Sequence, residues 1–404
     1  MPDFGLADIE AVRPLVDSVA VRTPLHESRW LSQLAGVPVW LKCENLQRTG
    51  SFKVRGAAVR IAQLAPEVRE RGVVAASAGN HAQGVALAAQ QHGIPATVFM
   101  PDGAPLPKER ATRAYGADIV FGGPTLEDCL VLAQARADET GATLIHPFDH
   151  ADIVAGQGTL GLEVVEQCPD VATVMVPAGG AGLLAGVAVA VKGRRPGTRV
   201  VGVQAAGAAA IPPSLAAGHP IRLERMSTMA DGIAVGRPGE FTLPLVERYV
   251  DEIRTVSEES LSRGVLALVE REKLVVEAAG AAAAAGFADL LAAGERLPGP
   301  VVVVLSGGNI DPLLLGKVIQ HGMAAAGRYL SVDVHIPDVP GGLVGLLREI
   351  ADAGANVLEV AHERVSPRLH VGEVVVHLQL ETRGPEHAEA VLARVREHGF
   401  VVDQ

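Results

Sequence analysis

The order of strand-like and helix-like segments is the feature that most constrains the fold of this chain. Between residues 37 and 305, short runs of β-branched residues alternate with alanine-rich segments. Parallel strands need crossover connections, so this alternation predicts doubly wound parallel sheets with flanking helices, in two units. The expected strands are Val37–Lys42, Val73–Ala76, Ala96–Met100, Ile119–Phe121, Thr173–Val176, Val200–Val203 and Val301–Leu305. The expected helices include His81–His92, Leu126–Glu139, Thr159–Gln167 and Leu261–Arg271.

The pattern changes after residue 328, where strands and helices follow a different order. The expected elements are strand Tyr329–Ile336, helix Gly342–Ala353, strands Asn356–Val365 and Val371–Glu381, helix Pro385–His398 and strand Phe400–Val402. This βαββαβ order predicts a ferredoxin-like sandwich. We therefore expect one domain over residues 1–325, with a smaller subdomain at about 72–149 inserted in it, and a second domain over 329–404. The segment Met323–Gly327 would join them.

Composition and charge exclude several classes of function. The 404 residues include 48% hydrophobic side chains but only 3% aromatic ones, which predicts large cores built from small residues. A net charge of −11 argues against binding to nucleic acid. Met1–Phe4 lacks a basic segment followed by an apolar run, and no run is long enough to span a bilayer. The three cysteines lack metal-like spacing, which favours free thiols in a reducing cytosol.

One lysine stands in a context that suits covalent chemistry. Lys53 follows Phe52 between Gly50 and Gly56, directly before a helix-like segment. The positive end of a helix and apolar neighbours both lower the pKa of an amine, and a free amine attacks carbonyl groups. An ordinary surface lysine is the alternative interpretation, because its stem can lie along the protein.

Three glycine-containing turns follow expected strands. Ser77–Gly84 and Pro177–Leu183 each connect a strand with a helix, and Ser306–Asn309 follows a third strand. Backbone N–H groups at a helix N-terminus favour a carboxylate or a phosphate. Open α/β sheets bind ligands at the carboxyl ends of their strands. Helix capping and tight structural turns remain the alternatives for each turn. A cofactor with an aldehyde, a phosphate and a ring nitrogen would use the lysine and all three turns.

These motifs resemble those of the fold-type II pyridoxal-phosphate enzymes, and specifically the threonine/serine ammonia-lyase family. Ser51–Ala57 resembles the family's Schiff-base motif, Ser77–Gly84 its substrate loop, Gly179–Leu183 its phosphate loop and Ser306–Asn309 its ring-nitrogen segment. The matches occur in the family's order, over roughly residues 15 to 325. The resemblance implies pyridoxal 5'-phosphate as cofactor.

The resemblance also implies a role for each matched residue. Lys53 would form the Schiff base with the cofactor and act as the base at the substrate Cα. The other cofactor-binding residues would be Phe52, Asn80 at the phenolic oxygen, Ser306 at the ring nitrogen, and Gly179, Gly180, Ala181, Gly182 and Leu183 at the phosphate. The substrate-binding residues would be Ser77, Gly79, Asn80, His81 and, beside Pro147 and Asp149, Phe148.

Departures from neighbouring families narrow the expected reaction. Serine racemases resemble this chain but have a second serine where it has Ala78, which cannot transfer a proton. They also have acidic metal ligands in the stretch that matches Val203–Ala210, where this chain has no carboxylate. We therefore expect poor racemisation and no metal site. Sulfhydrylases and threonine synthases usually have aspartate and threonine where this chain has Val54 and His81.

The implied reaction is elimination of water from L-threonine, followed by hydrolysis to 2-oxobutanoate and ammonia. Because Ser306 is neutral, it would not enforce a protonated ring, which favours rapid loss of the β-hydroxyl group. L-Serine would be a secondary substrate, since one methyl group contributes only about 1–3 kcal/mol to selectivity. The alternatives are an L-serine dehydratase, a serine racemase-like enzyme, or an amino-acid-sensing protein without activity. The sequence does not decide between isoleucine synthesis and threonine breakdown.

The tail from Tyr329 onward resembles an ACT domain, a module that often binds amino acids. Gly341, Gly342 and Leu343, in the turn after its first strand, and Asn356, which starts its second, would bind the effector. The resemblance suggests isoleucine or valine as that effector. Such modules commonly pair between subunits, so we expect a cytoplasmic homodimer or homotetramer. A dimerisation domain without a ligand is the alternative interpretation.

Overall fold

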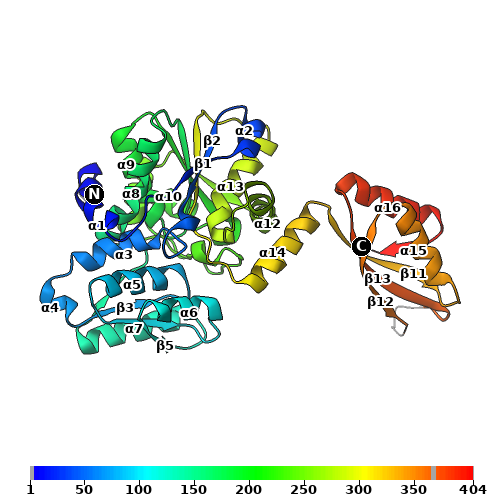
Figure 1. Cartoon of the computed structure of the whole chain (residues 1–404), viewed down its shortest axis with the longest axis horizontal. Helices are drawn as coiled ribbons and strands as arrows, with labels where there is room; N and C mark the ends of the chain where they lie inside the picture. Colours follow the sequence, from blue (N-terminus) through cyan, green and yellow to red (C-terminus); the bar gives the residue numbers. More distant parts are fainter. Residues whose placement is uncertain (1–3, 365–369, 404) are drawn as a thin grey trace. The chain divides into compact units, whose positions relative to one another are not determined.

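The computed structural model describes residues 4–364 and 370–403, and its contacts divide the chain into two units, Met1–Leu315 and Gly316–Gln404. Met1–Asp3 and Val365, which entered the sequence analysis, lie outside the described residues. The division falls within helix α14 (Pro312–Ala325), so the expected junction at Met323–Gly327 begins near the end of that helix. We describe each unit by itself (Figure 1).

A six-stranded sheet forms the centre of the first unit. Its order is β1-β2-β10-β7-β8-β9, and all neighbours are parallel except β1 and β2. The strands are β1 (Leu25–Glu27), β2 (Val39–Cys43), β7 (Thr173–Pro177), β8 (Arg199–Ala205), β9 (Glu252–Val256) and β10 (Val301–Leu305). Every residue of β7 and β10 is buried, as expected for parallel strands covered on both faces.

Helices cover this sheet on both sides (Figure 1). α8 (Ala151–Gln167) and α9 (Gly182–Arg194) pack together on one side with α1 (Leu6–Asp17) and α11 (Thr242–Tyr249). α12 (Glu258–Ala267) and α13 (Ala278–Ala292) lie on the other side. Glycines permit the close approach of α8 and α9, because a Cβ at Gly186 would come within 2.4 Å of the Val154 carbonyl oxygen. Shorter elements of this unit are the helices α2 (Arg29–Ala35) and α10 (Ile211–Ala217), the 3-10 helices η1 (Glu44–Leu46), η2 (Ala206–Ala208) and η3 (Asp231–Ile233), and the π-helix η4 (Leu268–Glu272).

A smaller parallel sheet, with the order β5-β4-β3-β6, lies in the same unit. Its strands are β3 (Val73–Ala76), β4 (Ala96–Met100), β5 (Asp118–Phe121) and β6 (Thr143–Leu144). Helices α3 (Lys53–Ala62), α4 (Pro66–Arg69), α5 (Asn80–Gln91), α6 (Leu106–Ala114) and α7 (Leu126–Thr140) accompany it. Because α3 contacts both α5 and α8, it connects the small sheet with the helices of the large one.

The second unit has the predicted βαββαβ order. Its elements are β11 (Tyr329–Pro337), α15 (Gly342–Asp352), β12 (Asn356–Glu363), β13 (Glu373–Glu381), α16 (Pro385–Glu397) and β14 (Val401–Asp403). They form an antiparallel sheet of order β12-β13-β11-β14. Alternate residues of β11 and β13 pack with α15 and α16 in a core of its own. The predicted α/β fold with a ferredoxin-like tail is therefore confirmed.

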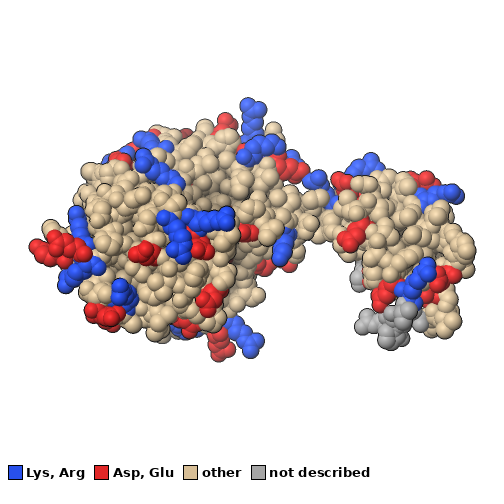
Figure 2. Space-filling view, turned by 60° about the horizontal axis from the view of Figure 1, so that its bottom comes forward, with Lys and Arg blue, Asp and Glu red and all other residues tan. Residues whose placement is uncertain are grey.

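Two further observations concern the surface. In the part of the chain that the structure describes, no helix combines the length and the apolar character needed to cross a membrane. Lys and Arg side chains are intermixed with Asp and Glu on the face shown in Figure 2. That face therefore presents no extended field of one sign.

Candidate active site

A pocket of about 550 Å³ lies in the first unit, and the predicted site residues converge on it. Its walls include residues that directly follow β3, β7 and β10, which are the carboxyl ends of strands in the two parallel sheets. Open parallel sheets bind their ligands at such ends. The predicted members among its lining residues are Phe52, Lys53, Ser77, Gly79, Asn80, His81, Phe148, Gly179, Gly180, Ala181, Gly182, Leu183 and Ser306.

Lys53 is the first residue of α3, and its amine faces this pocket. The segment before it is fixed by Ser306–Gly308, since the Phe52 N–H donates to the Ser306 carbonyl oxygen at 3.1 Å and the Gly308 N–H to that of Gly50 at 2.8 Å. The Lys53 Nζ atom donates to the Pro147 carbonyl oxygen at 2.9 Å and lies 5.2 Å from the centre of the Phe52 ring.

Burial makes the Lys53 amine unusually easy to deprotonate. Desolvation lowers the pKa of Lys53 to about 8, although the nearby Glu277 carboxylate opposes this shift. An ordinary lysine amine has a pKa of about 10.4, so a much larger share of Lys53 is the nucleophilic free amine near neutral pH. The sequence predicted the direction of this shift from the helix end and the apolar neighbours.

The loop after β3 places Ser77, Gly79 and Asn80 on the pocket wall. The Gly79 N–H donates to Ser77 Oγ at 3.1 Å, and Asn80 begins α5. His81 is buried, where its Nε2 atom lies 2.8 Å from the Ile145 carbonyl oxygen. Burial lowers the pKa of His81 to about 3, so its ring is neutral at physiological pH. His81 thus positions the loop as an uncharged hydrogen-bonding group.

The glycine loop after β7 leads into the N-terminus of α9. Ala181 has a left-handed backbone (φ 73°), and Gly182 begins the helix. The first N–H groups of a helix have no acceptor within it, which makes this loop suitable for a phosphate. The glycines also meet a packing requirement, because a Cβ at Gly180 would come within 2.4 Å of the Phe148 ring. The Phe148 ring therefore requires glycine at position 180 of this loop, and it also lines the pocket.

The turn after β10 brings the fourth predicted segment to the site. Ser306 is buried directly after the strand, and Asn309 directly follows the glycine pair Gly307-Gly308. The Asn309 Nδ2 atom donates to the Asn80 side-chain oxygen at 2.8 Å and to the Thr49 carbonyl oxygen at 2.6 Å. Asn309 therefore connects the Lys53 segment with the loop after β3.

Glu277, a carboxylate at the centre of this arrangement, was not predicted from the sequence. Glu277 precedes α13, lines the pocket and accepts a hydrogen bond from Asn80 Nδ2 at 2.5 Å. Burial and the Asp231 carboxylate raise the pKa of Glu277 to about 7, against the opposing influence of Lys108, Asn80 and Lys53. One signal was present in the sequence, because Glu277 is the only charged residue between Lys273 and Asp289.

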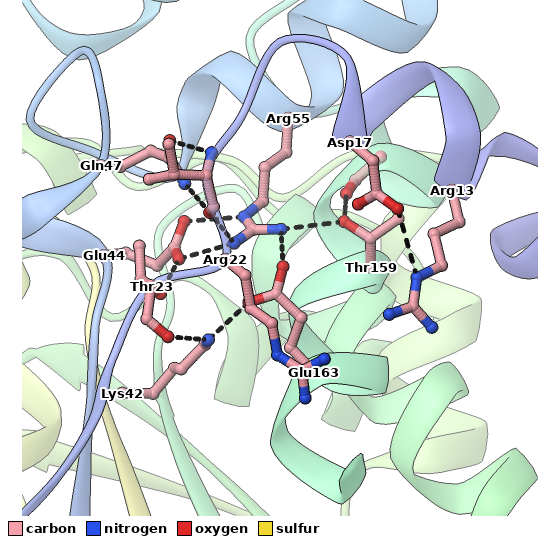
Figure 3. Close-up of polar contacts among 12 residues, drawn as sticks. Arg13, Asp17, Arg22, Thr23, Lys42, Glu44, Gln47, Arg55, Thr159 and Glu163 are labelled. Carbon is pink, nitrogen blue, oxygen red and sulfur yellow. Dashed lines mark hydrogen bonds and ion pairs between the residues drawn. The ribbon is translucent and has the colours of Figure 1, made fainter. Parts of the chain in front are cut away.

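A network of buried charges surrounds Arg55, which lies two residues after Lys53 on the same helix. Arg55 donates two hydrogen bonds to Glu44 at 2.8 Å each and one to Glu163 at 2.7 Å, and Lys42 also pairs with Glu163 (Figure 3). Burial opposes the charge on Arg55, but these carboxylates outweigh it and raise its pKa further. This network was not predicted from the sequence.

The predicted effector residues do not come together within one chain. Gly341 has a left-handed backbone (φ 92°) and caps α15, near the end of β11. Asn356 pairs with Glu381, which is opposite Tyr329 at the start of β11. The nine residues of β11 separate these positions by about 25 Å along the sheet. Gly342 and Leu343 therefore share an end of the sheet with Gly341 but not with Asn356.

The pocket has the donor set that pyridoxal phosphate requires. A lysine with a lowered pKa can take up the aldehyde, the N-terminus of α9 can hold the phosphate, and the Ser306 hydroxyl group can meet the ring nitrogen. The buried Ser51 Oγ and Gln157 Oε1 atoms have no hydrogen-bond partner among the residues that the structure describes, and Gln157 lines the pocket. No group of three or more metal-ligating side chains occurs in the described ranges 4–364 and 370–403.

Comparisons with known proteins give the same family. The chain is 44% identical over 382 residues to an "L-threonine ammonia-lyase" of Geobacter sulfurreducens, covering 95% of this chain and 94% of that protein. A solved threonine deaminase isoform of Solanum lycopersicum is 37% identical, with a TM-score of 0.76 over 80% of this chain and 87% of that one.

A serine racemase of maize is 34% identical, with a TM-score of 0.72 over 78% of this chain and 96% of that one. The family model described as pyridoxal-phosphate dependent enzyme matches residues 16–307. This range contains the lysine, both glycine-rich loops and Ser306, which all reach the same pocket. The chain therefore belongs to the family of pyridoxal-phosphate dependent enzymes.

Proposed function

We propose that this protein is a threonine ammonia-lyase that converts L-threonine to 2-oxobutanoate and ammonia. The observation that supports this most strongly is the convergence of Lys53, the loop after β3, the glycine loop and Ser306 on one pocket. Relatives with that name, 44% identical over nearly the whole chain, point to the same substrate. When bound, pyridoxal phosphate supplies an electron sink for negative charge at the substrate Cα.

Each of the other roles in the reaction is assigned to a residue of the chain. Lys53 holds the cofactor and then, as a free amine, takes the proton from Cα. The N–H groups and hydroxyl group of the Ser77–Gly79 turn receive the substrate carboxylate. Asn80 is held by Asn309 and Glu277, and its amide would meet the cofactor's phenolic oxygen. The α9 N-terminus would hold the phosphate, and the neutral Ser306 hydroxyl group would meet the ring nitrogen.

We also propose L-serine as a secondary substrate and racemisation as at most a minor reaction. The pocket wall has the methyl group of Ala78 where a racemase would need a second proton donor. Phe148 supplies an apolar surface, whose preference for the extra methyl group of threonine is about 1–3 kcal/mol. The structural likeness to a serine racemase makes D-serine the informative comparison.

For the second unit, we propose an ACT-type regulatory module in a homo-oligomeric cytoplasmic enzyme. Its βαββαβ order and left-handed Gly341 before α15 support an effector site at that helix end. Because Asn356 lies at the other end of the sheet, an effector that contacts all four predicted residues would bridge two copies of the chain. Isoleucine and valine are the effectors to test, by their influence on activity and on thermal stability.

The decisive experiment is an assay of 2-oxo acid formation from L-threonine, L-serine and D-serine. We expect 2-oxobutanoate from L-threonine, slower formation of pyruvate from L-serine and little product from D-serine. Lys53→Ala removes both the cofactor attachment and the base, so we expect its turnover to fall by at least about 10³-fold. Lys317→Ala, on an exposed helix position, is the matched control. Unchanged turnover by Lys53→Ala would contradict the proposal.

A further inference from the structure

Lys108 is a buried lysine on the pocket wall that neither the motifs nor the reaction described above uses. It lies on α6, beside the small sheet, and its side chain is only 10% exposed. Its amine donates to the Asp231 carboxylate at 2.7 Å. Asp231 begins η3, which packs against α13 of the large sheet, so this ion pair connects the two sheets across the pocket.

The Lys108 side chain lies close to Gly79 in the loop after β3. A Cβ built on Gly79 would lie 3.5 Å from the Lys108 amine and 3.7 and 3.9 Å from two carbons of its stem. Gly79 belongs to the turn that we assign to the substrate carboxylate. The cation therefore lies directly against the backbone that would receive an anion.

The two partners of this ion pair differ strongly in their access to water. The Asp231 side chain is 60% exposed, and its other oxygen accepts the Gly232 N–H at 2.8 Å. Asp231 can therefore leave the pair and remain solvated and hydrogen-bonded. The Lys108 amine has little access to water, so in the absence of Asp231 it favours another anionic partner. An amino-acid carboxylate on the Ser77–Gly79 turn is such a partner.

We propose that Lys108 is a substrate-binding residue that exchanges the Asp231 carboxylate for the carboxylate of the incoming amino acid. This inference rests on the proposed function and adds a cationic contact to the backbone donors of the loop. The exchange releases Asp231 from the small-sheet side of the pocket when the substrate binds. It also gives the site a preference for free α-carboxylates over neutral derivatives, since hydrogen bonds to charged groups are stronger than neutral ones.

The test compares L-threonine with L-threoninamide, in which a neutral amide replaces the carboxylate. Ammonia release measures turnover of both compounds by the cofactor-loaded enzyme. For Lys108→Met we expect the KM for L-threonine to rise about 10- to 100-fold, as for the loss of a charged hydrogen bond, with a smaller change in kcat. The KM for L-threoninamide should change less than about threefold on the same reasoning. Asp231→Asn removes the competing carboxylate and should lower the KM for L-threonine.

Arg222→Met is the matched control, because Arg222 is another cation of the pocket wall but is exposed. It should leave the ratio of the two KM values unchanged. Equal changes for both substrates in Lys108→Met, no change for either, or a changed ratio in Arg222→Met would overturn the inference.

A calorimetric titration with L-2-aminobutanoate, which lacks the β-hydroxyl group, and with its amide separates this inference from the proposed function. Lys108→Met should weaken binding of the acid and not of the amide, and equal effects on both would contradict the inference. A wild-type enzyme that binds the acid but forms no 2-oxobutanoate from L-threonine would contradict only the proposed function.

Discussion

Two clusters of charge lie on opposite sides of the first turn of α3, and they differ in how completely their members are paired. Arg55 belongs to the buried network with Lys42, Glu44 and Glu163, in which two positive charges meet two negative ones. Lys53, two residues earlier, faces the pocket, where its amine donates to the neutral Pro147 carbonyl oxygen.

This difference in pairing explains the difference in acid–base behaviour. Burial opposes the charge of both side chains. At Arg55, two carboxylates outweigh burial and raise the pKa, whereas at Lys53 burial dominates and lowers the pKa to about 8. On the pocket side, burial also raises the pKa of Glu277 to about 7. Arg55 and Glu44 therefore keep their charges, although burial lowers the pKa of Lys42 in the same network. The pocket, in contrast, keeps groups that can gain or lose a proton near neutral pH.

Breaking the network should give the largest loss of stability. Arg55→Met leaves Glu44 and Glu163 buried without their main partner, so we expect the free energy of unfolding to fall by about 3–5 kcal/mol. Both tryptophans, Trp30 and Trp40, belong to the first unit, so their fluorescence during urea unfolding reports on this unit alone.

The matched control is Arg113→Met, which removes the exposed pair with Glu109 on α6. We expect it to change the free energy of unfolding by less than about 1 kcal/mol. If Arg55→Met lowered the free energy of unfolding by no more than this control does, the expected cost of leaving Glu44 and Glu163 buried without Arg55 would be contradicted.

Removing the carboxylate of Glu277 should have a smaller effect of the opposite sign. The folded protein raises the pKa of Glu277 to about 7, so between about pH 4.5 and 7 the unfolded chain releases a proton that the folded one keeps. Stability therefore falls as the pH rises through this window. Glu277→Gln does not titrate, so it should gain stability relative to the wild type, up to about 2–3 kcal/mol at pH 8.

The measurement is urea unfolding of cofactor-free protein at several pH values from 5 to 8. Glu67→Gln, at an exposed position of α4, is the control and should show no such trend. A stability difference between Glu277→Gln and wild type that does not grow with pH would show that the carboxyl group is not destabilised by burial.

The same contrast shows what could be predicted from the sequence. The strands Val73–Ala76 and Val301–Leu305 have the predicted bounds, because runs of β-branched residues between helices are local signals. The motifs around Lys53, Ser77–Gly84 and Ser306 are local as well, and their strand-end positions predicted that they would meet at one edge. The family identified from them is confirmed.

The residues that were missed depend on partners far away in the chain. Arg55 and Glu163 are 108 positions apart, and Asn80 and Glu277 are 197 apart, so no local pattern connects them. Helix α13 was not singled out because it is almost entirely small and buried, with no polar face to reveal its period. Strand β1 has only three residues and forms the antiparallel edge of the large sheet, which a pattern of parallel crossovers does not predict.

The smallest predicted effect is a shift in the pKa of Lys53, the lysine of α3 that faces the pocket. In cofactor-free protein, the rate at which acetic anhydride labels Lys53, normalised to an added small amine, should level off above a midpoint near pH 8. An ordinary lysine would level off near pH 10.4. Because the Glu277 carboxylate raises the pKa of Lys53, Glu277→Gln should move the midpoint to lower pH. Peptide mass spectrometry measures the labelling, and a midpoint near 10 in both proteins would mean that burial does not prepare this amine for reaction.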